Sequence, residues 1–158
     1  MSLRLVSLLK EYGVSHRNQT NKRIHNIFVP LITWSVLMLL WAIPPVKILG
    51  GIQVFYVVAT LALFYYWKLD PKVFLAMFGV IALSAMSFVI LSSMNVSLLN
   101  LGLAVFVIGW IFQFIGHKIE GKKPSFIQDL QFLLIGPIWV AINLGLFEHL
   151  RVQLSVKG

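Results

Sequence analysis

The chain has 158 residues, of which 59% are hydrophobic and only 11% are charged. About a quarter of the residues in a soluble domain are charged, so this composition excludes an ordinary soluble protein and indicates a membrane protein. The net charge is +8, from 13 Lys and Arg against 5 Asp and Glu. Basic loops orient membrane proteins and contact anionic headgroups. No basic stretch here alternates with stacking aromatic residues, so we expect no nucleic-acid partner. The chain has no cysteine, which excludes disulfides, thiolate metal sites and cysteine nucleophiles.

The first residues, MSLRLVSLLKEYG, favour a short helix at the membrane surface. Apolar side chains from Leu3 to Tyr12 alternate with polar ones in a helical pattern. Gly13 is a typical residue just beyond a helix end. The apolar stretch is too short for a secretory signal, and no small-residue cleavage site follows it.

Five hydrophobic runs follow, and each predicts a helix that enters the membrane. They are Ile27–Ile43, Ile52–Trp67, Val73–Met94, Leu98–Ile115 and Leu130–Phe147. A helix needs about 20 residues to cross a core of about 30 Å, so the first two runs are marginal and the third is long enough. Pro30 disfavours helical geometry in the residue before it. We therefore expect a bend or an opening there, and a first hairpin that penetrates the membrane without fully crossing. Pro137 similarly predicts a break in the fifth run.

The joints between the runs are short and carry turn signals. These signals are Pro44-Pro45 with Gly50-Gly51, then Asp70-Pro71, then Asn95 with Ser97. No stretch has the composition of a flexible interdomain linker. We therefore predict an all-α fold in one integral membrane domain, 1–158, built as a polytopic bundle of about five hydrophobic helices plus the short N-terminal interfacial helix.

The distribution of basic residues predicts the orientation. With the N-terminus inside, all Lys and Arg fall in inside segments except Lys47, Arg151 and Lys157, as the positive-inside rule requires for a cytoplasmic face. An even number of crossings separates the first two histidines from the third, even if the first hairpin is re-entrant. We therefore expect three histidines at the cytoplasmic face: His16, His25 and His117. The fourth, His149, follows the fifth run and is expected at the opposite face or at an interface.

Helical periodicity groups the polar residues around these histidines. Asn18, Asn21 and His25 share one helical face, and Gln113, His117 and Glu120 share another. His16 would lie about 180° around a straight helix from His25. We therefore expect this helix to begin after His16, with Ser15 or Asn18 as its cap.

These residue types suit a metal site. Imidazole and carboxylate are ligands of non-haem Fe(II), and such a set leaves positions open for substrate and O₂. Amides behind the ligands orient them, a role for which Asn18, Asn21 and Gln113 are candidates. A plainer interpretation is also open, in which each histidine is an interfacial polar residue and Glu120 forms a solvated ion pair with Lys122, Lys123 or Arg23.

The same residues form a longer pattern. It consists of Tyr12-Gly13, His16, Asn18, Asn21, Ile24-His25 and Val29-Pro30, followed by Gln113-Phe114-Ile115-Gly116-His117, Glu120, Pro124 and Leu133-Leu134-Ile135-Gly136-Pro137. Over nearly the whole chain this pattern resembles the yeast-type 2-hydroxy-fatty-acid dioxygenases. The resemblance implies an Fe²⁺-dependent α-oxidation, in which O₂ cleaves the C1–C2 bond of a long-chain 2-hydroxy fatty acid and leaves a fatty acid one carbon shorter.

The resemblance also implies residue roles. The metal ligands would be His16, His25 and His117, and Glu120 is the weaker candidate, as a further ligand or as a catalytic acid or base. Three basic residues would attract the substrate carboxylate, although topology alone explains them equally well: Arg17, Lys22 and Arg23. The acyl chain belongs in the bilayer with its head at the interface. The expected location is the inner membrane of a bacterium or the endoplasmic reticulum membrane of a eukaryote, with the site facing the cytoplasm.

The sequence also bears on other classes of function. Membrane di-iron desaturases need many more histidines than the four present. Haem ligation by two histidines, a non-enzymatic lipid-binding role and a small transporter stay open as alternatives. Transporters usually place ionisable residues or broken helices near the midplane, yet the runs 52–67 and 73–115 contain no charged residue.

Overall fold

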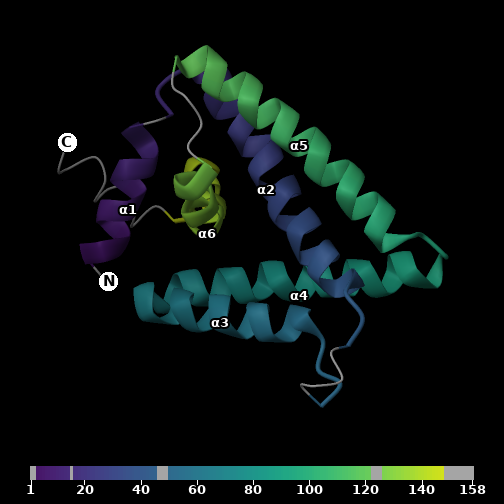
Figure 1. The fold of residues 1–158 in the computed structure, drawn as a ribbon. Coiled ribbons are helices and arrows are strands. Elements are labelled where there is room, and N and C mark those ends of the chain that lie inside the picture. The colour runs from purple at the N-terminus through teal and green to yellow at the C-terminus, as the bar shows by residue number, and fades with distance from the viewer. Residues whose placement is uncertain (1–2, 15, 46–49, 122–125, 148–158) are drawn as a thin grey trace. The chain divides into compact units, whose positions relative to one another are not determined.

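The structure is a computed structural model that describes residues 3–14, 16–45, 50–121 and 126–147. Within these residues the regular secondary structure is helical, which confirms the all-α prediction (Figure 1). The helices are α1 Leu3–Val14, α2 Gln19–Ala42, α3 Val54–Leu69, α4 Pro71–Ser93, α5 Leu98–Glu120 and α6 Phe126–Asn143. The expected position of His149, at the opposite face or at an interface, concerns a residue outside this described part of the chain.

Three of these helices, α2, α4 and α5, are long and apolar enough to cross a membrane, while α3 and the segment Leu133–Asn143 are shorter apolar helices. Pro30 lies inside α2 and Pro137 inside α6. The expected opening at Pro30 and the expected break at Pro137 are therefore wrong. Proline fixes φ near its helical value and removes one backbone donor, and a helix with packed neighbours tolerates that loss.

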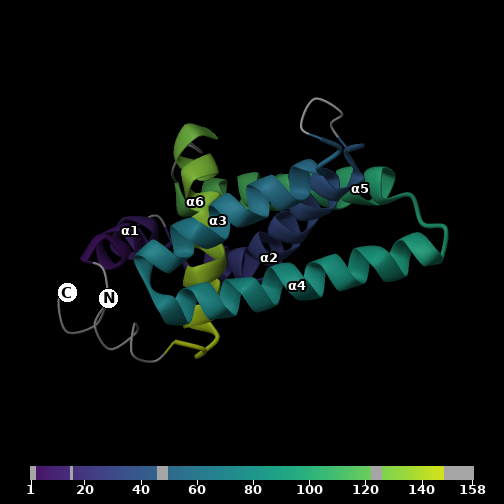
Figure 2. The same ribbon diagram turned by 90° about the horizontal axis from the view of Figure 1, so that it is seen from below.

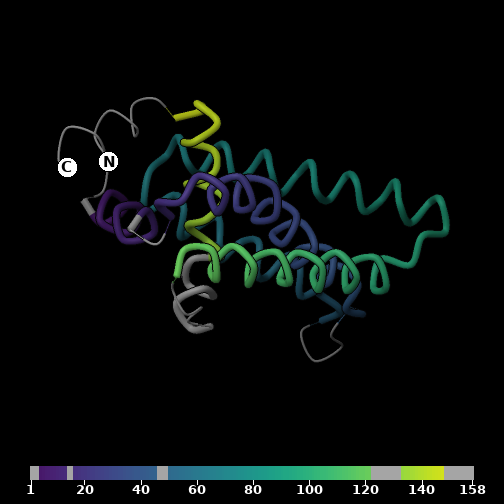
Figure 3. Tube along the Cα trace, turned by 90° about the horizontal axis from the view of Figure 1, so that it is seen from above, coloured from purple at the N-terminus to yellow at the C-terminus, as the bar shows by residue number. Residues whose placement is uncertain are grey.

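The chain divides into two compact units. We call Met1–Thr33 with Ile108–Gly158 the terminal unit, and Trp34–Val107 the central unit. Helices α2 and α5 contribute residues to both, and the trace follows each of them without interruption (Figure 3). That the whole chain forms one domain stays a prediction, and each unit is described by itself below.

In the central unit α3 and α4 run side by side (Figure 1 and Figure 2). Asp70 separates them, and its Oδ1 accepts hydrogen bonds from the backbone N–H of Lys72 at 2.8 Å and of Val73 at 3.3 Å. With Pro71 as the first residue, this is a capped start to α4, and it confirms the turn expected at Asp70-Pro71. At the next joint Asn95 has a φ of 59°, a left-handed conformation that asparagine tolerates better than most residues.

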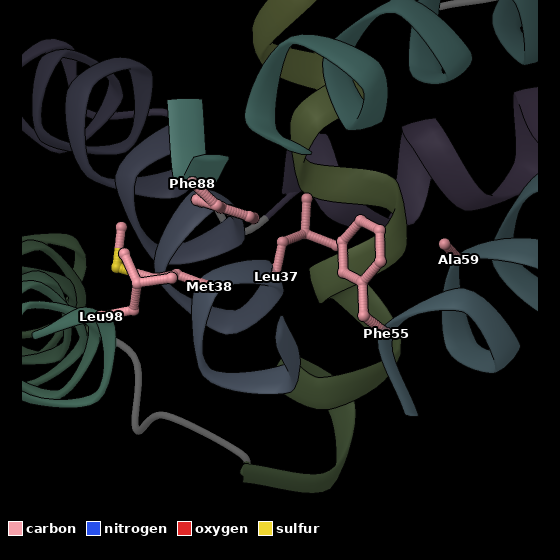
Figure 4. Close-up of a cluster of buried hydrophobic side chains, with 6 residues drawn as sticks. All are labelled: Leu37, Met38, Phe55, Ala59, Phe88 and Leu98. Atoms are coloured by element: carbon pink, nitrogen blue, oxygen red, sulfur yellow. The ribbon is translucent and has the colours of Figure 1, made fainter. Parts of the chain in front are cut away.

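Apolar side chains from α2, α3, α4 and α5 make the core of the central unit. Figure 4 shows its buried members, which are Leu37, Met38, Phe55, Ala59, Phe88 and Leu98. One polar bond supports this core, because the Nε1 of Trp34 donates to the Oγ of Ser87 at 3.0 Å. These contacts hold together the parts of α2, α3, α4 and α5 that belong to the central unit.

In the terminal unit α1 packs against α6. The apolar face of α1 is buried, with Leu5 and Leu9 exposed by no more than 1%. Glycine allows close approach: a Cβ at Gly136 of α6 would lie 3.2 Å from the Tyr12 Oη. On the other side α2 meets α5, where the rings of Phe28 and Phe112 stack at 4.1 Å. These contacts bring the end of α1, the start of α2, the end of α5 and α6 around one buried space.

Candidate functional site

His16 is held in the turn between α1 and α2, as the sequence predicted. Its backbone N–H donates to the carbonyl of Gly13 at 3.1 Å, and its Nδ1 bonds to the carbonyl of Tyr12 at 2.6 Å. The Tyr12 ring stacks on the imidazole with centroids 4.2 Å apart and planes 11° from parallel. The side chain is buried, with 3% exposure, so backbone and aromatic contacts both fix this ring.

Asn18 caps α2, which confirms one of the two expected caps. Its Oδ1 accepts from the backbone N–H of Thr20 at 2.8 Å and of Asn21 at 3.4 Å. His25 lies further along the same helix with 1% exposure, and its Nδ1 bonds to the carbonyl of Asn21 at 3.0 Å. The cap thereby sets the register that turns His25 inward.

The two Nδ1 contacts determine the tautomers of His16 and His25. A carbonyl oxygen can only accept, so the Nδ1 of each ring carries the hydrogen. In the neutral imidazole the lone pair then lies on Nε2. Histidines that bind metals usually donate their other N–H to a carbonyl or a carboxylate in this way. Both rings therefore present the nitrogen that would bind a metal ion.

His117, near the end of α5, brings the third imidazole to the same place. Its ring centroid lies 5.5 Å from that of His25 and 6.1 Å from that of His16, and those two rings are 4.1 Å apart. With a metal–nitrogen bond of about 2.1 Å, two rings on one ion have centres at most roughly 6.5 Å apart. All three separations satisfy this limit. In the described part of the chain no three such side chains already surround one metal position, so an ion would require the rings to turn.

The histidines open onto a cavity of ≈ 50 Å³. The described residues that line it are Tyr12, His16, His25, Val29, Ile32, Trp110, Gln113, His117 and Leu133. Among these, the polar groups are three imidazoles, one carboxamide and two aromatic residues, and the others are aliphatic. Pockets that enclose a whole drug-sized ligand have volumes of about 300 Å³ or more, so this cavity accommodates a small polar group and not a long acyl chain.

Glu120, the predicted catalytic carboxylate, contacts the start of α2 and is not among the residues that line the cavity. Its Oε1 accepts from the backbone N–H of Arg17 at 2.7 Å, and its Oε2 accepts from the N–H of Asn18 at 3.0 Å and from the Nδ2 of Asn21 at 2.9 Å. A carboxylate at a helix N-terminus accepts hydrogen bonds from the unpaired backbone N–H groups of the first turn and interacts favourably with the helix dipole. Glu120 thus ties the end of α5 to the start of α2, as the adjacent ends in Figure 1 show. The resemblance implies a catalytic role for Glu120, whereas these contacts favour a structural one.

The change Glu120→Gln tests what this carboxylate does. It puts an NH₂ group among N–H donors, so we expect the thermal midpoint in detergent to fall, by the equivalent of about 1 kcal/mol for a lost helix cap. Turnover per bound metal ion should stay unchanged. The matched control is Glu11→Gln on the exposed face of α1, which should change neither quantity. Unaltered stability with turnover abolished would instead assign Glu120 an acid–base role.

The remaining predicted residues take different positions. The Gln113 carboxamide is buried and lines the cavity. Asn18 caps the start of α2, and the backbone carbonyl of Asn21 bonds to the Nδ1 of His25. The basic residues proposed to attract the substrate do not line the cavity: Arg17 and Arg23 are exposed and Lys22 is partly exposed. They can act on an approaching anion only through their field.

Three aromatic residues belong to the site although the sequence predicted a different role for them. The sequence pattern puts Tyr12 on the surface helix, and tryptophans toward the ends of hydrophobic runs, such as Trp110 and Trp139, are typical of interfacial aromatic belts. Trp139 is instead buried, with 6% exposure, and its ring lies 5.2 Å from both Tyr12 and His16. Tryptophan near a helix end occurs both in belts and in buried contacts, so its position in the sequence did not distinguish the two.

Comparison with known proteins places both histidine-bearing segments in one family. The chain matches the family model described as "2-hydroxy-palmitic acid dioxygenase Mpo1-like" over residues 3–145. It is 34% identical over 160 residues to 2-hydroxy-palmitic acid dioxygenase MPO1 of Saccharomyces cerevisiae (strain ATCC 204508 / S288c), and the match covers 97% of this chain and 88% of the yeast protein. No solved structure matches the chain.

Proposed function

The chain belongs to the Mpo1-like family of 2-hydroxy-palmitic acid dioxygenases and is a dioxygenase of 2-hydroxy fatty acids, and we propose that it works by Fe²⁺-dependent α-oxidation at His16, His25 and His117. One observation supports this assignment most directly. Imidazoles from two segments far apart in the sequence meet at one buried cavity, and in two of them Nδ1 bonds to a backbone carbonyl, which leaves Nε2 as the nitrogen that could bind an ion.

The proposed reaction converts R–CH(OH)–COOH and O₂ into R–COOH, CO₂ and H₂O. The C1–C2 bond breaks, C1 leaves as CO₂, C2 becomes the new carboxyl carbon, and O₂ takes up the four electrons. A ferrous ion would supply the electrons that activate O₂ and a position at which the substrate's carboxylate and hydroxyl oxygens chelate. The donor set of neutral imidazoles suits Fe²⁺ while leaving positions for both.

The protein's own part is to hold the imidazoles and to exclude water. Backbone carbonyls of Tyr12 and Asn21 keep His16 and His25 in the tautomer that exposes Nε2. The cap at Asn18 and the carboxylate of Glu120 hold the start of α2 in place behind them. Because the cavity has a volume of only ≈ 50 Å³, it admits the substrate's head. The acyl chain then stays in the lipid, where each CH₂ gains about 0.8 kcal/mol relative to water.

We further propose that the site faces the cytoplasm. The basic residues near it, Arg17, Lys22 and Arg23, favour this orientation and raise the local concentration of an anionic head. The haem alternative receives no support from the cavity, whose ≈ 50 Å³ is far below the roughly 300 Å³ at which pockets for drug-sized ligands begin.

Purified protein in detergent, loaded anaerobically with Fe²⁺ and then given O₂ and 2-hydroxyhexadecanoic acid, should form pentadecanoic acid. Mass spectrometry identifies the product, and substrate labelled with ¹³C at C1 should release the label as CO₂. Near-stoichiometric iron is expected in the purified protein. Wild-type protein that lacks iron and stays inactive after loading would defeat the proposal.

A further inference from the structure

Gln113 is the buried amide of the cavity. It lies on α5 one helical turn before His117, on the same face. Its side chain has 6% exposure and lines the cavity together with the three histidines. Among the described residues, its Nε2 has no hydrogen-bond partner. A buried amide donor that lacks a partner destabilises a fold by about 1 to 3 kcal/mol. A ligand that accepts a hydrogen bond from this donor would remove that destabilisation.

This donor does not serve the histidines. The Nδ1 atoms of His16 and His25 bond to backbone carbonyls, and the Gln113 Nε2 donates to no side chain in the described part of the chain. The orienting role expected for this amide from the sequence therefore falls to backbone carbonyls at two of the three rings. What remains for the N–H of Gln113 is whatever enters the cavity.

The size and polarity of the cavity limit what that is. A volume of ≈ 50 Å³ admits the carboxylate and the first carbons of a fatty acid, and these must lie beside the imidazoles for the C1–C2 bond to react. No Lys or Arg is among the described residues that line the cavity. A neutral N–H donor can stabilise a carboxylate there without the desolvation that a buried cation requires.

On the basis of the proposed function, we infer that Gln113 is a substrate-binding residue whose Nε2–H donates to a carboxylate oxygen of the 2-hydroxy fatty acid. This contact would orient the acid so that C1 and C2 face the imidazoles. It also assigns recognition of the carboxylate to the cavity wall, which leaves the exposed basic residues to guide the acid toward the site.

Two variants of near-equal size test the contact. Gln113→Met removes the donor, and Gln113→Glu replaces it by a carboxylate that repels the substrate. We expect anaerobic affinity for 2-hydroxyhexadecanoic acid, measured by tryptophan fluorescence because Trp110 lines the cavity, to fall about 10- to 100-fold in the Met variant, as for a lost bond to a charged group. The Glu variant should bind still more weakly. Both should retain iron, which shows that they fold.

Controls separate this inference from the proposed function. Gln53→Met, at the start of α3 in the central unit, should leave binding unchanged. Hexadecanoic acid, which lacks the 2-hydroxyl, should lose the same factor in Gln113→Met. A loss restricted to the hydroxy acid would overturn the carboxylate assignment. If wild-type protein shortens 2-hydroxyhexadecanoic acid while Gln113→Met binds it with wild-type affinity, this inference alone fails. If wild-type protein neither binds nor shortens the acid, both fail.

Discussion

Alanine at His25 or at His117 should remove bound iron from a chain that still folds. Each side chain is a proposed ligand and each is buried, with exposures of 1% and 7%. Loss of a residue that merely supports a ligand weakens metal affinity about 10- to 100-fold, so loss of a ligand should exceed that range. Metal analysis of the purified variants should show iron falling from near one ion per chain to trace levels, and pentadecanoic acid formation should disappear with it.

The fourth histidine provides the matched control. His149→Ala removes the same chemical group at a position expected on the opposite face or at an interface, and it should retain both iron and activity. Helix content by circular dichroism should be the same in all three variants, because the packing of α2 and α5 rests on apolar contacts such as the Phe28 and Phe112 stack. Full iron occupancy in both His25→Ala and His117→Ala would show that the metal binds elsewhere.

Capping residues and helical spacing predicted the helix ends better than hydrophobicity did. Turn residues such as Asp70 and Asn95 act through local backbone geometry, so the joints they mark were found where expected. The first hydrophobic run begins only at Ile27, but the capping residues predicted a helix that begins after His16, and α2 begins at Gln19. Hydrophobicity alone ends where polar residues begin, whereas here the polar side chains lie inside the protein and the helix continues through them. In the same way α5 extends to Glu120, beyond the end of the hydrophobic run at Ile115, as the shared helical face of Gln113, His117 and Glu120 predicted.

The meeting of the histidines was predictable from the number of membrane crossings expected between them, because an even number returns the chain to the same face. The atoms that hold them were not. The contact of Trp139 with His16 and the bonds of Glu120 to the start of α2 join residues far apart in the sequence. Such contacts depend on how helices pack, which periodicity does not specify.

The sequence does contain one signal for the packing of α5 against α2. Glycines recur on α5 at seven-residue intervals, at Gly102, Gly109 and Gly116, a spacing that puts small residues on one face. In the central unit Gly102 lies against Leu39, and in the terminal unit Gly109 lies against Ile32 and Gly116 against Asn21. This repeat identifies the face of α5 that approaches α2. Gly116, the last glycine of the repeat, directly precedes His117 in the sequence.

Gly116→Ala should consequently disable the site with little loss of overall stability. The new Cβ would collide with the Oδ1 of Asn21 and lie 3.3 Å from the Cε1 of His25. Asn21 is fully buried and its Nδ2 bonds to Glu120 at 2.9 Å, so it cannot turn away without breaking that bond. Overpacking costs about 1 to 3 kcal/mol, and alanine returns about 1 kcal/mol of helix propensity, so the two helices should separate slightly and not unfold.

The proposed reaction would not tolerate this separation, because it moves apart the helices α2 and α5, which carry His25 and His117. We expect iron affinity and turnover each to fall at least about tenfold, as when a group behind a metal ligand is lost, with the thermal midpoint shifted by only a few degrees. The matched control is Gly79→Ala on α4, where a Cβ meets nothing within 4 Å, and it should alter neither property. Wild-type iron binding in Gly116→Ala would mean that the close approach of α2 and α5 is not what brings the imidazoles together.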